Sequence, residues 1–103
     1  MSLLRDSARE QECLIRIPHC CNFKSDTVVL CHYRLGGLSG MGFKASDILG
    51  AFGCSACHDL VDGRTHSQHF TRKEILLMHA EGIFRTQAWW LEHGFIKAGG
   101  DER

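Results

Sequence analysis

The stretch that decides the predicted fold is Phe52-Gly-Cys-Ser-Ala-Cys-His-Asp-Leu-Val-Asp62. Cys54 and Cys57 have the Cys-x-x-Cys spacing with which two thiolates bind one zinc ion where a tight turn opens into a helix. His58 and Asp62 follow on that helix four residues apart, so their side chains face the same way. We therefore expect this segment to hold a structural metal ion and, beside it, a chemically active one.

Length and composition limit the remaining choices. A chain of 103 residues is expected to form one domain with a modest core, which a bound metal ion would stabilise appreciably. The 12 basic and 12 acidic residues cancel, so no overall field draws the protein to nucleic acid, and any basic face must come from local arrangement. The N-terminus meets charge at once, unlike a signal peptide, and no apolar run approaches membrane-spanning length. We expect a cytoplasmic protein without a membrane partner.

The cysteines outside the opening stretch offer a second pair of zinc ligands. Six cysteines in a short chain can form a disulfide framework, but without a secretory signal a metal site is the better interpretation. Residues 13–17 are predicted to form a short strand that Pro18 ends, which gives the outline of a zinc knuckle. Its ligands would be Cys13 and either Cys20 or Cys21, and the spacing does not choose between the last two. Four cysteines around one ion make a closed, structural site.

The first half of the chain supplies a strand and a loop. Residues 1–12 are expected to form a helix or an arm, and Thr27–His32 is the clearest strand, since it is apolar and β-branched. Four glycines make residues 35–46 a loop, in which Lys44 is a notable polar residue. Asp47 is expected to cap the apolar stretch that follows it.

The last third predicts one long helix. Thr71 and Glu74 match a capping box at its start, and Gly94 is expected to stop it. Residues 98–103 are predicted to be a frayed tail. Aromatic side chains along this segment are expected to lie in the core rather than to stack on bases, namely Phe84, Trp89, Trp90 and Phe95.

Three side chains could form a one-metal phosphodiesterase site. A hard divalent ion held by His58 and Asp62 could bind a scissile phosphate, while His32 removes a proton from the attacking water. Alternatively, His58 belongs to the outer face of the zinc site and Asp62 is a solvated helix position. His66 is a reserve candidate in the loop before the long helix, where an exposed position is the simpler interpretation.

Several of these residues carry a resemblance to known families. His32, the loop with Asp47 and the order Cys54-x-x-Cys57-His58 resemble the zinc-containing HNH nucleases, also called ββα-metal or His-Me finger nucleases, whose fold is similar to a treble clef. More closely, four segments resemble the YbcO-like nucleases of phages and prophages: Gln11-Glu-Cys-Leu-Ile-Arg-Ile-Pro18, His32-x-Arg34-Leu35, Cys54-Ser-Ala-Cys-His-Asp59 and Arg64-Thr-His66. The likeness covers nearly the whole chain.

The resemblance implies a fold and a structural metal. The fold would be a small, zinc-stapled α+β domain of the HNH type, spanning residues 1–103 with an additional C-terminal helix. The family pattern places its second cysteine at Cys21, so the resemblance assigns zinc to Cys13, Cys21, Cys54 and Cys57. It leaves Cys20 as a spare thiol and Cys31 as a strand residue.

The resemblance also implies an activity. The protein would be a metal-dependent DNA endonuclease in the cytoplasm of a bacterial host, with His32 as general base. His58 and Asp62 would bind Mg²⁺ or Mn²⁺, and Arg34 and Lys44 would neutralise phosphate. Two positions depart from the wider HNH pattern, because Cys31 stands where an Asp or His metal ligand is common, and Asp47 stands where an Asn is usual.

Two other functions fit the same residues. A catalytically silent zinc module would bind DNA or a phage recombination or packaging protein. A redox protein would use Cys54 and Cys57, and predicts reactive thiols with little zinc.

Overall fold

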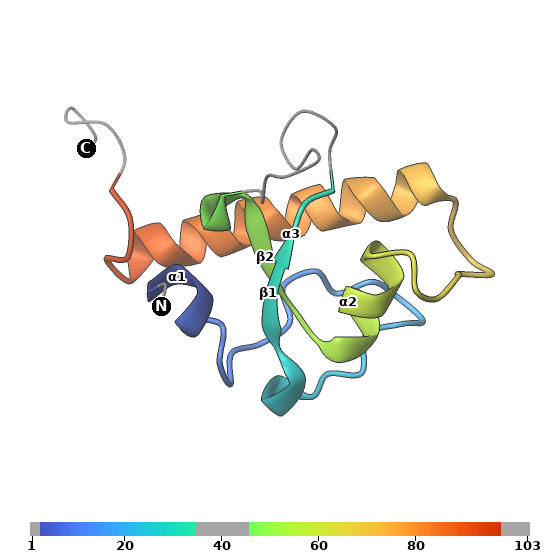
Figure 1. Cartoon of the computed structure of the whole chain (residues 1–103), viewed down its shortest axis with the longest axis horizontal. Coiled ribbons are helices and arrows are strands. Elements are labelled where there is room, and N and C mark those ends of the chain that lie inside the picture. Colours follow the sequence, from blue (N-terminus) through green and yellow to red (C-terminus); the bar gives the residue numbers. More distant parts are fainter. Residues whose placement is uncertain (1–2, 35–45, 98–103) are drawn as a thin grey trace.

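Two short antiparallel strands packed on one long helix form the frame of the computed structural model, which describes residues 3–34 and 46–97. Strand β1 is Val29–His32 and β2 is Gly50–Gly53, with Leu30 opposite Phe52 in the register. Helix α3, Arg72–Glu92, runs along the length of the molecule, and both strands cross it (Figure 1). The sheet is therefore covered on one face by α3.

The other elements are short and lie around this frame. They are α1 (Leu3–Asp6), the 3₁₀ turns η1 (Ser25–Thr27) and η2 (Asp47–Leu49), and α2 (Ser55–Val61). In Figure 1, α1 and α2 lie on opposite sides of β1. The predicted strand from Thr27 begins two residues later, because Thr27 ends a turn in which its hydroxyl donates to the Lys24 carbonyl at 2.8 Å.

Helix α3 begins and ends as the sequence predicts. The Glu74 amide donates to the Thr71 hydroxyl at 3.2 Å, and the Thr71 amide donates to the Glu74 carboxylate at 2.8 Å, which completes the capping box. Past its end, Gly94 has φ +80°, a left-handed conformation that favours glycine. The buried face of the helix consists of Ile75, His79, Gly82, Ile83, Thr86 and Trp90.

Strand β2 is the centre of the core. Phe52 is fully buried and meets the rings of Trp89 and Trp90 edge-on, at centroid distances of 5.3 and 5.8 Å. Its amide donates to the Thr86 hydroxyl at 3.0 Å, and its carbonyl accepts from the Leu14 amide at 2.7 Å. The backbone of β2 away from β1 is thus hydrogen-bonded to α3 and to the N-terminal segment.

The strand predicted over residues 13–17 is wrong. Arg16 has φ +54°, which turns the chain, and its amide donates to the Cys13 sulfur at 3.5 Å. The Leu14 carbonyl accepts from the Arg85 guanidinium at 2.8 Å rather than from a neighbouring strand. The segment winds around a sulfur atom, so its apolar residues are buried without belonging to a sheet.

The expectation of an aromatic core is only partly confirmed. Trp90 is fully buried and Trp89 is half-buried, but Phe84 is 68% exposed and Phe95 is 39% exposed. Phe84 lies on the side of α3 opposite to the core. Lys44 and the predicted tail 98–103 lie outside the described residues. Among the described helices, none has both the length and the apolar character required to cross a membrane.

Candidate metal centre and catalytic edge

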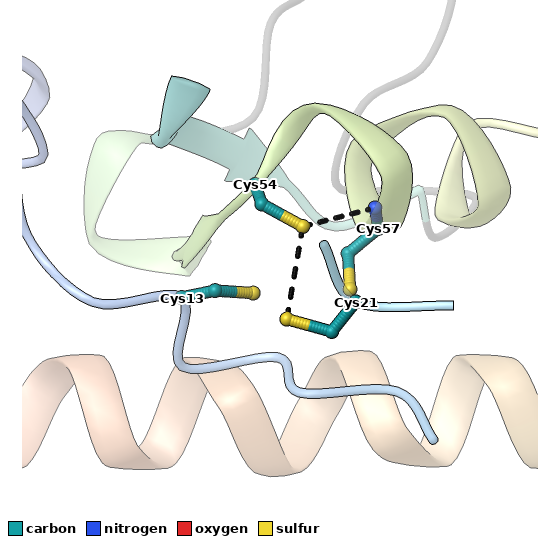
Figure 2. Close-up of side chains that lie close together, drawn as sticks. All are labelled: Cys13, Cys21, Cys54 and Cys57. Atoms are coloured by element: carbon teal, nitrogen blue, oxygen red, sulfur yellow. Dashed lines mark hydrogen bonds between the residues drawn. The ribbon is translucent and has the colours of Figure 1, made fainter. Parts of the chain in front are cut away.

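Four cysteine sulfurs converge between the N-terminal segment and α2. The sulfurs of Cys13, Cys21, Cys54 and Cys57 all lie within 4.8 Å of one another (Figure 2). The Cys21 and Cys54 sulfurs are 3.8 Å apart. A tetrahedron with metal–sulfur bonds of about 2.3 Å has edges of about 3.8 Å, so the cluster has the dimensions of a zinc site. These four residues could therefore hold a metal ion such as zinc.

Local backbone geometry directs amides at the sulfurs. Cys54 is the N-cap of α2, and its sulfur accepts from the Cys57 amide at 3.5 Å and from the Asn22 amide at 3.4 Å. The Cys13 sulfur accepts from the Arg16 amide. Hydrogen bonds from amides to sulfur would also stabilise the negative charge that thiolate ligands carry in a metal site.

The four thiols cannot all ionise without a cation. The Cys57 thiol donates to the Cys13 sulfur, which lowers the pKa of Cys13 to about 4 and raises the pKa of Cys57. Burial and the neighbouring negative charge raise the pKa of Cys21 to about 12. Cys13 is thus favoured as a thiolate over Cys21 and Cys57, and a divalent ion would displace the protons of the latter two.

The other two cysteines lie outside this group. Cys20 donates to the Ala56 carbonyl at 3.4 Å, and burial raises the pKa of its thiol. Cys31 is fully buried in β1, where burial likewise raises its pKa. All six cysteines are free, and the cluster contains Cys21 rather than Cys20.

His32 ends β1 in contact with a carboxylate. Its Nε2 lies 2.7 Å from Asp47 Oδ1, which is a hydrogen-bonding distance. A carboxylate can only accept, so the neutral ring carries its proton on Nε2 and its lone pair on Nδ1. The expected capping role of Asp47 is wrong, because Ser46 caps the turn by accepting from the Ile48 amide. Asp47 also lies 3.7 Å from the Arg5 guanidinium. Asp47 is therefore placed to fix the tautomer and orientation of His32.

Asp62 connects the end of β1 to the end of α2. Its side chain is only 4% exposed, and Oδ1 accepts from Arg34 Nε at 3.2 Å. Oδ2 lies 3.1 Å from His58 Nε2 and 3.2 Å from Arg64 Nη2, but neither approach has hydrogen-bond geometry. Asp62 is thus a buried carboxylate whose Oδ2 lies near two cationic side chains but accepts no hydrogen bond from them, and it is not a solvated helix position.

Three of the predicted site residues are joined by direct contacts, since Asp62 contacts both Arg34 and His58. His32 stands two residues before Arg34 in the chain, so the end of β1 is linked to the face of α2 that carries His58. His66 is exposed and lines an open cavity of about 440 Å³ with His19 and other residues.

His79 is a buried polar residue that the sequence interpretation did not single out. Its Nε2 donates to the Cys31 carbonyl at 2.8 Å, its Nδ1 has no partner, and burial lowers its pKa, so the ring is neutral. It holds the backbone directly before His32. The sequence contained a signal for this residue, because position 79 lies midway between Ile75 and Ile83 on the apolar face of α3. A polar residue on such a face is buried and therefore indicates a specific hydrogen bond or a functional role.

Comparisons with known proteins agree on one family. The family model described as "Putative nuclease YbcO" matches residues 2–95. "Putative nuclease YbcO" of Escherichia coli (strain K12) and "Putative nuclease ybcO" of Enterobacteria phage 82 are each 48% identical to this chain over 99 residues. Each alignment covers 95% of this chain and 100% of the relative.

A solved structure is also similar. It is described as "Structure of a putative bacteriophage protein from Escherichia coli str. K-12 substr. MG1655", and it matches with a TM-score of 0.76 and 39% sequence identity. The match covers 89% of this chain and 100% of the other. Sequence and structure therefore connect this chain to phage and bacterial relatives, two of which carry the name "Putative nuclease".

Proposed function

Because this chain belongs to the YbcO nuclease family, we propose that it is a metal-dependent DNA endonuclease of the HNH type and of phage or prophage origin. The observation that carries the mechanism is that the buried Asp62 carboxylate contacts both His58 and Arg34. Arg34 stands only two residues after His32, so this contact links the proposed metal ligands to the proposed base. A general base, a pair of metal ligands and a phosphate-binding cation would then share one edge of the molecule. DNA is the substrate expected for such an edge.

The cysteine cluster would hold zinc in a purely structural role. Four sulfurs leave no open coordination position, so this ion would not touch the substrate. It would join the N-terminal segment to α2 and so fix the position of the helix that carries His58.

The spacing of His58 and Asp62 fits a second, divalent ion. Neighbouring ligands of an octahedral ion with bonds of about 2.1 Å lie about 3.0 Å apart, and the two side chains approach to 3.1 Å. The buried, unsatisfied Oδ2 of Asp62 is the kind of atom that an ion would satisfy. When bound, Mg²⁺ or Mn²⁺ would neutralise the scissile phosphate and stabilise the leaving oxygen.

The two arginines that contact Asp62 would move from this carboxylate to phosphate when the divalent ion and DNA bind. Arg34 and Arg64 occupy the carboxylate from two sides, and their side chains are 60% and 57% exposed, so both are free to swing outward. A cation at Asp62 would repel them, and a phosphodiester beside it would attract them. Arg34 would then bind phosphate, together with Lys44, which lies outside the described residues.

His32 would act as the base. Its Nδ1 accepts a proton from water, the resulting hydroxide attacks phosphorus, and one ester P–O bond breaks as the leaving oxygen takes a proton from solvent. The Asp47 carboxylate would stabilise the imidazolium that forms, since it lies 2.7 Å from Nε2.

Plasmid nicking tests this proposal. The parent, His32→Ala and His66→Ala are compared at matched zinc content, with Mg²⁺ or Mn²⁺ added. We expect His32→Ala to reduce the nicking rate by roughly 10²- to 10⁴-fold, the usual contribution of a general base, and His66→Ala to leave it unchanged. Equal rates in the parent and His32→Ala would remove His32 from the mechanism, and a loss confined to His66→Ala would transfer its role to His66.

A zinc module that binds without cleaving is the second candidate. The two arginines that already neutralise Asp62 favour it, because they compete with a catalytic cation. Such a module would bind DNA or a phage recombination or packaging protein. Absence of nicking with either ion and with any DNA form, together with retained DNA binding, would select this function.

A further inference from the structure

The outer side of α3 carries a stripe of exposed apolar side chains. Leu77, Phe84 and Leu91 are 59%, 68% and 45% exposed. They are seven residues apart, which is close to two helical turns, so they lie along one side of the helix. We refer to these three residues as the α3 stripe.

The α3 stripe faces away from the rest of the molecule. At 100° per residue, the stripe lies roughly 130–170° around the helix from the middle of the buried face, which runs between His79 and Thr86. Figure 1 shows α3 spanning the molecule with the strands packed across it. Together these side chains expose roughly 300 Å² of apolar surface, a size at which the largest apolar patch of a monomer is often functional.

We propose that the α3 stripe is a dimer interface between two copies of this chain, with the two helices antiparallel. The spacing is self-complementary, because Phe84 is equally far from Leu77 and Leu91. A two-fold axis at Phe84 therefore places Leu77 of one copy against Leu91 of the other, and the reverse contact forms at the same time. Ala88, one turn after Phe84, is small and exposed, which lets the helices approach closely.

The charges at the ends of the stripe favour the antiparallel arrangement. Exposed Lys73 lies in line with the stripe before Leu77, and exposed Glu92 follows Leu91. Parallel helices would place the two Lys73 ammonium groups side by side. Antiparallel helices separate them, bring each toward the Glu92 end of the other copy, and oppose the two helix dipoles.

The interface does not depend on the proposed nuclease activity. It lies on the side of α3 opposite to His79, which contacts the backbone before His32, so pairing leaves both candidate sites open. Two stripes of roughly 300 Å² provide less apolar area than a stable interface of about 1,200 Å² or more, so we expect a weak, reversible dimer with a dissociation constant of roughly 100 µM.

Sedimentation velocity of the zinc-loaded protein tests the dimer. Over roughly 10–500 µM we expect the parent to pass from monomer to dimer. Phe84→Glu should weaken association by about 30-fold or more, as expected for a central apolar contact. Phe23→Glu is the matched control, since Phe23 is 83% exposed but lies outside α3, and it should dimerise like the parent. A parent that stays monomeric throughout, or a Phe84→Glu variant that associates like the parent, would overturn the proposal.

A charge exchange tests the orientation. Leu77→Glu and Leu91→Lys should each weaken association, and the double variant should recover it, because only antiparallel helices place position 77 opposite position 91. Circular dichroism confirms that each variant is folded, which is expected because the altered side chains are exposed. A double variant that associates no better than the single ones would refute the antiparallel arrangement.

Discussion

Cutting the link between the cysteine cluster and α2 should cost a large fraction of the stability. The variant with both Cys54→Ser and Cys57→Ser leaves only Cys13 and Cys21, so an ion could no longer join the N-terminal segment to α2. Serine is itself a favoured N-cap, so the start of α2 keeps its capping interaction at position 54. The change therefore acts mainly on metal binding.

The magnitude follows from the loop that the ion closes. Cys21 and Cys54 are 33 positions apart, and a cross-link closing a loop of about 33 residues stabilises a fold by about 4 kcal/mol through the entropy of the unfolded chain. Domains of this size have a free energy of unfolding of about 5–15 kcal/mol. At about 4–8 °C for each kcal/mol, the melting temperature should fall by roughly 15–30 °C.

Thermal melts with and without a chelator test this reasoning. Removal of zinc by the chelator should lower the melting temperature of the zinc-loaded parent by the same amount, roughly 15–30 °C. The double variant should have a low melting temperature from the start, and the chelator should change it little, because the ion no longer bridges the two segments. Cys20→Ser is the matched control, since Cys20 lies outside the cluster, and it should keep both the high melting temperature and the response. Equal melting temperatures in the parent and the double variant would refute the structural role of the cluster.

Two further predictions concern buried polar groups of α3. Thr86→Val should lower the free energy of unfolding, measured in urea, by about 1–3 kcal/mol, because the Phe52 amide loses its acceptor. Thr86→Ser keeps a hydroxyl and should lower this free energy by less. A Thr86→Val variant as stable as the parent would contradict the role of this hydrogen bond. His79 should remain neutral as the pH falls through the usual histidine range, because burial lowers its pKa. The stability that His79 contributes should therefore be present above the pKa of histidine in the unfolded chain, and it should be lost as the pH falls below that value. Ring nitrogen chemical shifts of His79 that change at the same pH as those of histidine in a short unfolded peptide would show that His79 is not held neutral.

Local patterns in the sequence predicted the parts of the fold that depend on short separations. The capping box of Thr71 and Glu74, and the shared face of His58 and Asp62, each require only that one helix forms. The Cys-x-x-Cys spacing at the start of α2 is of the same kind. Such features follow from helical geometry, whatever the rest of the chain does.

Contacts between distant segments were not predictable in this way. Asp47 resembles a helix cap from its neighbours, and only the pairing of β1 with β2 brings it to His32. Arg16 adopts a left-handed conformation because a sulfur atom, rather than a neighbouring strand, accepts its amide. Phe84 was expected in the core because its type is apolar, and its position on the outer side of α3 emerges only once Ile75, Ile83 and Trp90 fix the buried face.

Helix α2 explains why the structural and catalytic proposals are connected. It has only seven residues, too few to be stable alone in water, and its first turn carries two of the four clustered sulfurs. His58 and Asp62 follow within the next turn, and their 3.1 Å separation requires that turn to be helical. At its other end, the Arg72 guanidinium donates to the Leu60 and Val61 carbonyls. A metal ion at the cysteine cluster would thus influence the proposed phosphate chemistry without touching phosphate, because it would hold the N-terminus of the helix that carries both proposed ligands.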